Sequence, residues 1–71
     1  MKKYHVNIMI NRDLKERERF NIDVFLEIPI VGLVHKRLEH SPMTYDTAYF
    51  TAQAIARTFS EPAQIGLGIE E

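Results

Sequence analysis

The fold is decided by residues 4–28, which read YHVNIMINRDLKERERFNIDVFLEI. Apolar side chains occupy every second position on both sides of a charged run that fits a turn. These positions are Tyr4, Val6, Ile8, Ile10, Phe20, Ile22, Val24, Leu26 and Ile28. A period of two is typical of a strand with one buried face. The stretch therefore predicts a β-hairpin over 4–28 whose even-numbered side chains point into the core.

Cross-strand pairing suggests a register for this hairpin. Apolar pairs and opposite charges coincide when Ile10 faces Phe20, and each such pair stabilises a sheet. The same register sets His5 across from Phe25 and leaves a short loop at the tip, although a longer loop is the alternative because no glycine is present there. The charged pairs that it predicts are Arg12 with Glu18 and Asp13 with Arg17.

Residues 29–40 fit either a short helix or a short strand. Val31, Val34 and Leu38 share one helical face, and Pro29 suits a first helical turn. Gly32 weakens a helix, and β-branched neighbours favour a strand. We expect a short helix here, with a third strand as the alternative.

Residues 43–59 carry the clearest helical pattern. Their apolar side chains recur at helical spacing and form one stripe, with Ser41 as the expected cap and Pro42 in the first turn. The stripe consists of Tyr45, Ala48, Tyr49, Ala52, Ile55, Ala56 and Phe59.

Residues 64–69 alternate again and predict a last strand.

Together these segments predict an α+β fold in one small domain, residues 1–71. We expect a small antiparallel sheet, made of hairpin 4–28 and strand 64–69 in the order 2-1-3, with helix 43–59 packed on one face. One helix returning over the sheet would make the last strand antiparallel to the first.

Composition narrows the class of protein. The chain has 71 residues, 45% of them hydrophobic, a net charge of -1 and no cysteine. Disulfides are excluded, and small cores are often helped by oligomerisation, so we expect a homodimer. The longest uncharged apolar run, 28–34, is too short for a bilayer, which needs about 20 residues. We therefore expect a cytoplasmic protein that does not enter membranes.

No arrangement of residues points to catalysis or to a cofactor. His5, His35 and His40 lack the spacing of a zinc site, and Gly66 and Gly68 are not followed by a helix that would bind phosphate. We therefore predict no enzyme, no metal and no cofactor. If a site forms at a dimer seam, the first residues to test are His5, His35 and Asp46.

Two aromatic residues fall outside the expected core. Phe25 is out of phase with the buried positions of the hairpin, and Phe50 lies nearly opposite the apolar stripe of the helix. Aromatic residues and arginine are favoured anchors at protein interfaces. The predicted partner-binding residues are Phe25, His5, Met9, Phe50 and Arg57.

The expected function is therefore that of a small interaction module. A regulator, inhibitor or adaptor that contacts another protein fits the absence of catalytic motifs, and accessory proteins of phages and mobile elements offer an analogy. The alternative is a nucleic-acid-binding module, which the balanced charge disfavours. Its binding residues would be Lys2, Lys3, Lys36 and Arg37.

Overall fold

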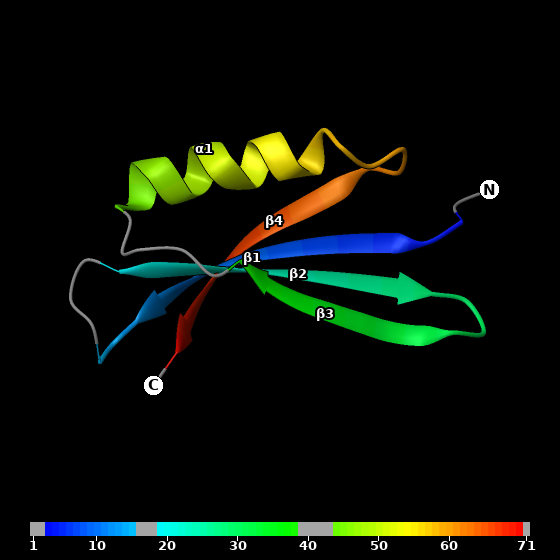
Figure 1. Ribbon diagram of the computed structural model, residues 1–71, viewed down its shortest axis with the longest axis horizontal. Coiled ribbons are helices and arrows are strands. Elements are labelled where there is room, and N and C mark those ends of the chain that lie inside the picture. Colours follow the sequence, from blue (N-terminus) through cyan, green and yellow to red (C-terminus); the bar gives the residue numbers. More distant parts are fainter. Residues whose placement is uncertain (1–2, 16–18, 39–43, 71) are drawn as a thin grey trace.

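A computed structural model of the chain describes residues 3–15, 19–38 and 44–70. Four strands and one helix follow one another along the chain (Figure 1). Their bounds are β1 (His5–Asp13), β2 (Phe20–Ile28), β3 (Gly32–Leu38), α1 (Tyr45–Ala56) and β4 (Ala63–Glu70). The expected α+β class is confirmed, although the sheet has one strand more than expected.

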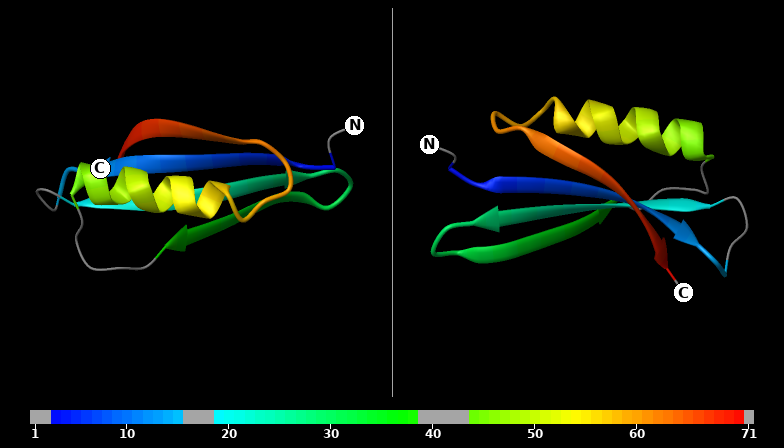
Figure 2. Two further views of the ribbon diagram at one scale, coloured as in Figure 1. Left: turned by 90° about the horizontal axis from the view of Figure 1, so that it is seen from above. Right: turned by 180° about the vertical axis from the view of Figure 1, so that it is seen from behind.

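The sheet is mixed, with the strand order β3-β2-β1-β4. β1 pairs antiparallel with β2, β2 pairs antiparallel with β3, and β4 lies parallel to β1 on its other side. α1 lies on one face of this sheet, as the two further views show (Figure 2). We call the face under α1 the helix-side face and the other the open face.

The expected antiparallel orientation of the last strand is wrong, and so is the expected helix at 29–40. The two errors share one cause. β3 is a strand and adds a reversal of direction, so that it runs the same way as β1. When the chain then returns through α1, β4 starts from the same end of the sheet as β1 and runs parallel to it.

The hairpin of β1 and β2 is confirmed, but its expected register is wrong by two residues. Ile10 faces Ile22 and Asn7 faces Phe25, and the Asp13 amide donates to the Arg19 carbonyl at 3.1 Å. Arg12 faces Phe20, so the loop is longer than three residues. The expected partners of Arg12 and Asp13, Glu18 and Arg17, lie outside the described residues. A slip of two residues keeps every side chain on its face, which is why the buried positions were still found correctly.

The core lies between β1, β2 and the middle of α1. Its apolar side chains come from the even-numbered positions expected for a buried face, and two alanines let the helix approach the sheet closely. The buried residues are Val6, Ile8, Ile10, Ile22, Ala48 and Ala52. Full burial of a valine or isoleucine side chain contributes about 1.5–3 kcal/mol, so these few residues supply much of the stability.

Aromatic pairs fix both ends of α1. The ring of Tyr45 packs edge-on against Phe20 with centroids 5.6 Å apart, and Phe59 does the same with Tyr4 at 6.3 Å. The helix is shorter than expected, and its cap is Thr44, whose side chain accepts from the Thr47 amide at 3.3 Å. Ser41 lies outside the described residues.

No helix in the described part of the chain is long and apolar enough to cross a membrane.

The glycines of β4 make room for side chains of β1. A Cβ at Gly66 would lie 2.8 Å from the sulfur of Met9, and one at Gly68 would collide with the side chain of Asn11. Both glycines lie on the open face, opposite Met9 and Asn11 in the parallel register. The alternation of glycine in this strand therefore has a packing reason.

The turn between β2 and β3 is strained. Ile30 has a φ of 73°, follows Pro29 and is fully exposed at 107%. A proline followed by a residue with positive φ is typical of a type II turn, whose second central position prefers glycine or asparagine. A β-branched residue in the left-handed region is unfavourable by about 1–2 kcal/mol.

Replacing Ile30 should therefore stabilise the protein. We expect Ile30→Asn to raise the free energy of unfolding by about 1 kcal/mol, because asparagine tolerates positive φ and the exposed side chain makes no contact to lose. Urea unfolding followed by circular dichroism measures the change. Val31→Asn is the control, since Val31 is also exposed but has no positive φ, and it should bring no gain. A less stable Ile30→Asn variant would contradict the strain.

Candidate functional site

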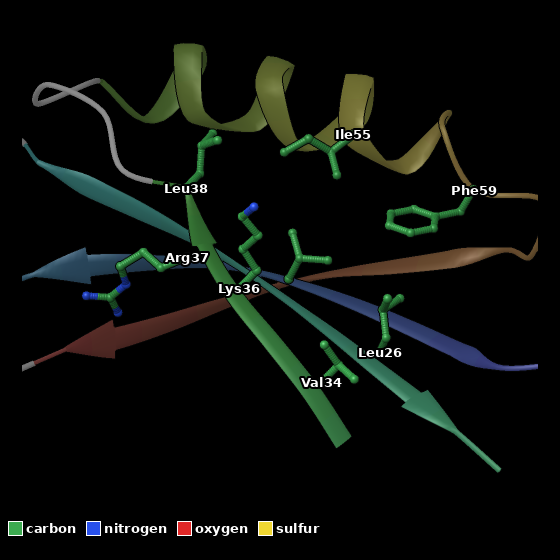
Figure 3. Close-up of a pocket in the computed structure, with 8 residues that line it drawn as sticks. Leu26, Val34, Lys36, Arg37, Leu38, Ile55 and Phe59 are labelled. Carbon is green, nitrogen blue, oxygen red and sulfur yellow. The ribbon is translucent and has the colours of Figure 1, made fainter. Parts of the chain in front are cut away.

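The helix is narrower than the sheet and leaves β3 uncovered. α1 packs against β1, β2 and β4 but does not approach β3. Between the helix and this strand lies an open groove of about 330 Å³ (Figure 3). Its walls are almost wholly apolar and consist of Val24, Leu26, Val34, Leu38, Ile55 and Phe59, with parts of Lys36 and Arg37 at the rim.

Helical geometry explains why Ile55 lines the groove, and Phe59 follows just after the helix ends. Ile55 follows the buried Ala52 by three residues, which places it about 60° to one side of the alanine row. Tyr49 follows Ala48 by one residue and lies on the opposite side. The helix therefore presents an apolar flank to the groove.

Lys36 is the free cation of this region. It lies on the helix-side face of β3, next to Val34 and Leu38, and its side chain points toward the helix (Figure 3). Among the described residues it forms no ion pair. An unpaired ammonium beside apolar walls favours a ligand that carries a carboxylate next to an apolar side chain.

Further apolar side chains are exposed at the β2–β3 turn, outside the groove. Ile30, Val31 and Leu33 are all largely exposed at this end of the hairpin. Exposed apolar residues that occur singly are normal, whereas a contiguous patch marks a site of interaction. Leu33 lies on the open face, opposite Glu27, so it belongs to a different surface from the groove. We call the groove the β3 surface and define it by Val34, Lys36, Leu38, Ile55 and Phe59.

The open face carries a polar cluster centred on Asp23. This carboxylate is 2% exposed and accepts hydrogen bonds from Asn11 at 2.6 Å and from Arg37 at 2.9 Å and 3.0 Å. The ring nitrogen Nε2 of His35 lies 2.7 Å from the same carboxylate. The cluster thus satisfies a charge that would otherwise be buried without partners.

Arg37 joins the two edges of the sheet through this cluster. From β3 it reaches both Asp23 on β2 and Glu70 on β4, the latter at 2.7 Å and 2.8 Å. Asn21 also donates to Glu70, at 3.0 Å. Because β3 and β4 are opposite edge strands, this ion pair requires the sheet to curl toward its open face. We read the cluster as structural.

The charges of the cluster shift the titration of its carboxyl groups. Burial raises the pKa of Asp23, but hydrogen bonds from Arg37, His35 and Asn11 outweigh it and lower the pKa from 3.8 to about 2. Hydrogen bonds from Arg37 and Asn21 lower the pKa of Glu70 as well. The bonds from Asp23 and Glu70 raise the pKa of Arg37 above its usual value. All three groups are therefore ionised at neutral pH.

The structure separates the residues that the sequence nominated for partner binding. Phe25 is partly buried on the open face, where its ring stacks on His35 with centroids 4.5 Å apart. His5 does not face Phe25, as expected, but Glu27, because of the register shift. Met9 leans over Gly66. These residues lie on the opposite side of the sheet from α1.

The helix residues of that prediction lie elsewhere. Phe50 is largely exposed on α1, and Arg57 is the exposed C-cap of the helix. Neither shares a surface with Phe25, because α1 lies on one face of the sheet (Figure 2) and Phe25 lies on the other. The nominated residues therefore form two separate patches rather than one.

The basic residues of the nucleic-acid alternative are also dispersed. Lys36 faces the groove, whereas Arg37 points to the open face and is held by two carboxylates. Lys3 is exposed near the start of β1, and Lys2 lies outside the described residues.

The three residues that we would test first for catalysis also lie apart. His5 and His35 lie on the open face and Asp46 lies on the helix. Within the described segments, no group of side chains is arranged to hold a metal ion.

Sequence reasoning missed both the groove and the polar cluster. The groove exists because 29–40 forms a strand beyond the reach of the helix, so the wrong expectation for this segment concealed it. The cluster unites residues from all four strands, and its geometry depends on the register. The sequence signal for the cluster was an aspartate, Asp23, in the middle of a predicted strand.

Comparison of the chain with protein-family models, with curated proteins and with solved structures finds no match. The geometry of the chain itself therefore carries the argument about function.

The lowered pKa of Asp23 predicts how stability depends on pH. A carboxyl group whose pKa is lower in the folded state stabilises the fold above its unfolded value, and this contribution disappears as the pH falls. We expect about 2 kcal/mol to be lost between pH 5 and pH 2 through this group, since one pKa unit corresponds to about 1.4 kcal/mol. Urea titrations at several pH values measure it.

The variant Asp23→Asn tests the assignment. It should be less stable than the parent at pH 7 and should lose most of the pH dependence in the acid range. Asp46→Asn is the control because Asp46 is exposed on the helix, and it should retain the parent's acid profile. An Asp23→Asn variant with the same acid profile as the parent would show that another group titrates.

Proposed function

We propose that this chain is a protein–protein interaction module that binds an extended segment of a partner protein along β3. The observation that carries the proposal is the apolar groove between α1 and β3, with the unpaired Lys36 at its rim. A segment that places an apolar side chain in the groove and a carboxylate beside Lys36 is the ligand that this chemistry favours. In cells such a module would act as a regulator, inhibitor or adaptor.

The backbone of β3 supports binding by strand addition. The Asp13 amide bonds to Arg19 of β2, so odd-numbered residues of β1 and β2 pair with each other through their backbones. Even-numbered residues of β2 must then pair with β3, because backbone groups alternate in direction along a strand. In β3 this leaves the amides and carbonyls of Leu33, His35 and Arg37 at the free edge. An added strand would bond to these groups.

The charge of β3 favours a foreign segment over a second copy of this strand. Lys36 is unpaired, and two such strands side by side would bring the lysines of both copies to one edge. Lysine on an edge strand is a common protection against self-pairing. An acidic segment meets no such penalty. The proposal therefore commits to a partner with alternating apolar and acidic residues.

Selection from a displayed library of random short peptides tests this function. The immobilised protein should enrich peptides that alternate apolar and acidic residues, and these should shift the NMR signals of β3 and of the Ile55–Phe59 flank. Lys36→Glu should weaken their binding by roughly tenfold, which corresponds to about 1.4 kcal/mol. Isothermal titration calorimetry gives the affinities.

Lys15→Glu is the matched control, since Lys15 is an exposed lysine at the tip of the first hairpin and away from the groove. Its affinity for the selected peptides should equal that of the parent. The proposal is wrong if no peptide is enriched, or if the enriched peptides bind Lys36→Glu as tightly as the parent.

A further inference from the structure

The second free edge of the sheet, β4, differs in chemistry from β3. The sheet twists strongly, so that the C-terminal half of β4 diverges from α1 (Figure 1). Leu67 and Ile69 lie on the helix-side face of this half and are 64% and 70% exposed. Between Ala63 and Glu70 the strand has no lysine, arginine or proline. It therefore lacks the usual devices that prevent edge strands from pairing.

The backbone of β4 offers its free groups at the apolar positions. The carbonyl of Glu70 accepts from the Leu14 amide at 2.9 Å, so the polar groups of residue 70 point toward β1. Because these groups alternate along a strand, those of Ile65, Leu67 and Ile69 point away from β1. The same three residues carry side chains on the helix-side face. An added strand at this edge would gain backbone hydrogen bonds and apolar contacts at the same positions.

We propose that two copies of this chain pair through their β4 strands in antiparallel orientation, forming a continuous eight-stranded sheet with both helices on one face. A register that pairs residues 64–70 of the two copies places Leu67 opposite Leu67 of the second copy and Ile65 opposite Ile69. Gln64 then faces Glu70, so no like charges meet. Apolar residues oppose apolar residues along the helix-side face, and such cross-strand pairs stabilise a sheet.

Symmetry and size support a second copy as the occupant. An antiparallel pair of identical edges has two-fold symmetry and closes, because each β4 strand is used once. The chain has a small buried core, and domains of this size often gain stability from oligomerisation. The β3 surface stays free in this dimer. The inference therefore stands apart from the proposed function, and either can fail alone.

A single engineered cysteine tests the register, because the natural chain contains none. Opposed residues in a hydrogen-bonded antiparallel pair have Cα atoms about 5.5 Å apart, within the range that a disulfide bridges. Under mild oxidation Leu67→Cys should form a cross-linked dimer almost completely. Phe50→Cys and Lys36→Cys are the controls, on the helix and on β3, and both should cross-link only at the slow rate of random collision.

Mass measurements test the association without a cross-link. By light scattering coupled to size-exclusion chromatography, the parent should have twice the 8.3 kDa mass of the chain. Leu67→Lys should shift it to the single-chain mass, while Phe50→Lys stays at twice the mass, and circular dichroism should show that both remain folded. A parent of single-chain mass at all concentrations would overturn the proposal, and so would Lys36→Cys cross-linking as fast as Leu67→Cys.

Discussion

The burial of β1 is the constraint on which the rest of the structure depends. This strand lies between β2 and β4, and Ile8 and Ile10 are fully buried beneath the helix. The side chains of Ala48 and Ala52 are small enough for the helix backbone to approach these isoleucines closely. Larger residues at the two alanine positions would lift the helix and open the core, since interiors are packed without spare volume. The even-numbered face of β1 thus determines where the helix lies.

The position of the helix in turn explains what remains exposed. One helix of 12 residues covers β1 and its neighbours but cannot cover a four-stranded sheet. β3 lies beyond its reach on one side, and the twisted end of β4 diverges from it on the other. The open face needs no second layer, because Asp23, Arg37 and Glu70 satisfy one another there. Val34, Leu67 and Ile69 are therefore exposed on the helix-side face, at the two edges of the sheet.

Much of the fold followed from the sequence, and the errors have identifiable physical causes. Alternation over 4–28 located the hairpin and its buried face, because a period of two defines the face whatever the register. The register itself depends on the loop, and charge pairing favoured a loop that is too short. Residues 29–40 were ambiguous because Val34 and Leu38, which are four residues apart, fit both periods, and pairing with β2 decided in favour of a strand. That one segment controlled the direction of β4, the strand order and the existence of the groove.

The candidate site was less accessible from the sequence for the same reason. Phe25 was expected to be exposed on the surface. In the structure His35 of β3 stacks on it, and this neighbour could not be predicted without the third strand. Lys36 and Arg37 are adjacent in sequence and looked like one basic pair, yet a strand sends them to opposite faces, where one is paired and the other is not. Only the unpaired residue can attract a partner, so the alternation of the strand decides which charge is available.

Both edges of the sheet expose unpaired backbone groups, but the side chains of the two edge strands differ in chemistry. Unpaired amides and carbonyls at an edge attract any strand that can reach them. β3 carries consecutive basic residues, and lysine on an edge strand is a common protection against self-pairing. β4 is uncharged except at its end and places identical apolar residues in self-complementary positions. The strained turn at Ile30 belongs to the first edge, and folding alone gives no reason for an isoleucine with positive φ there.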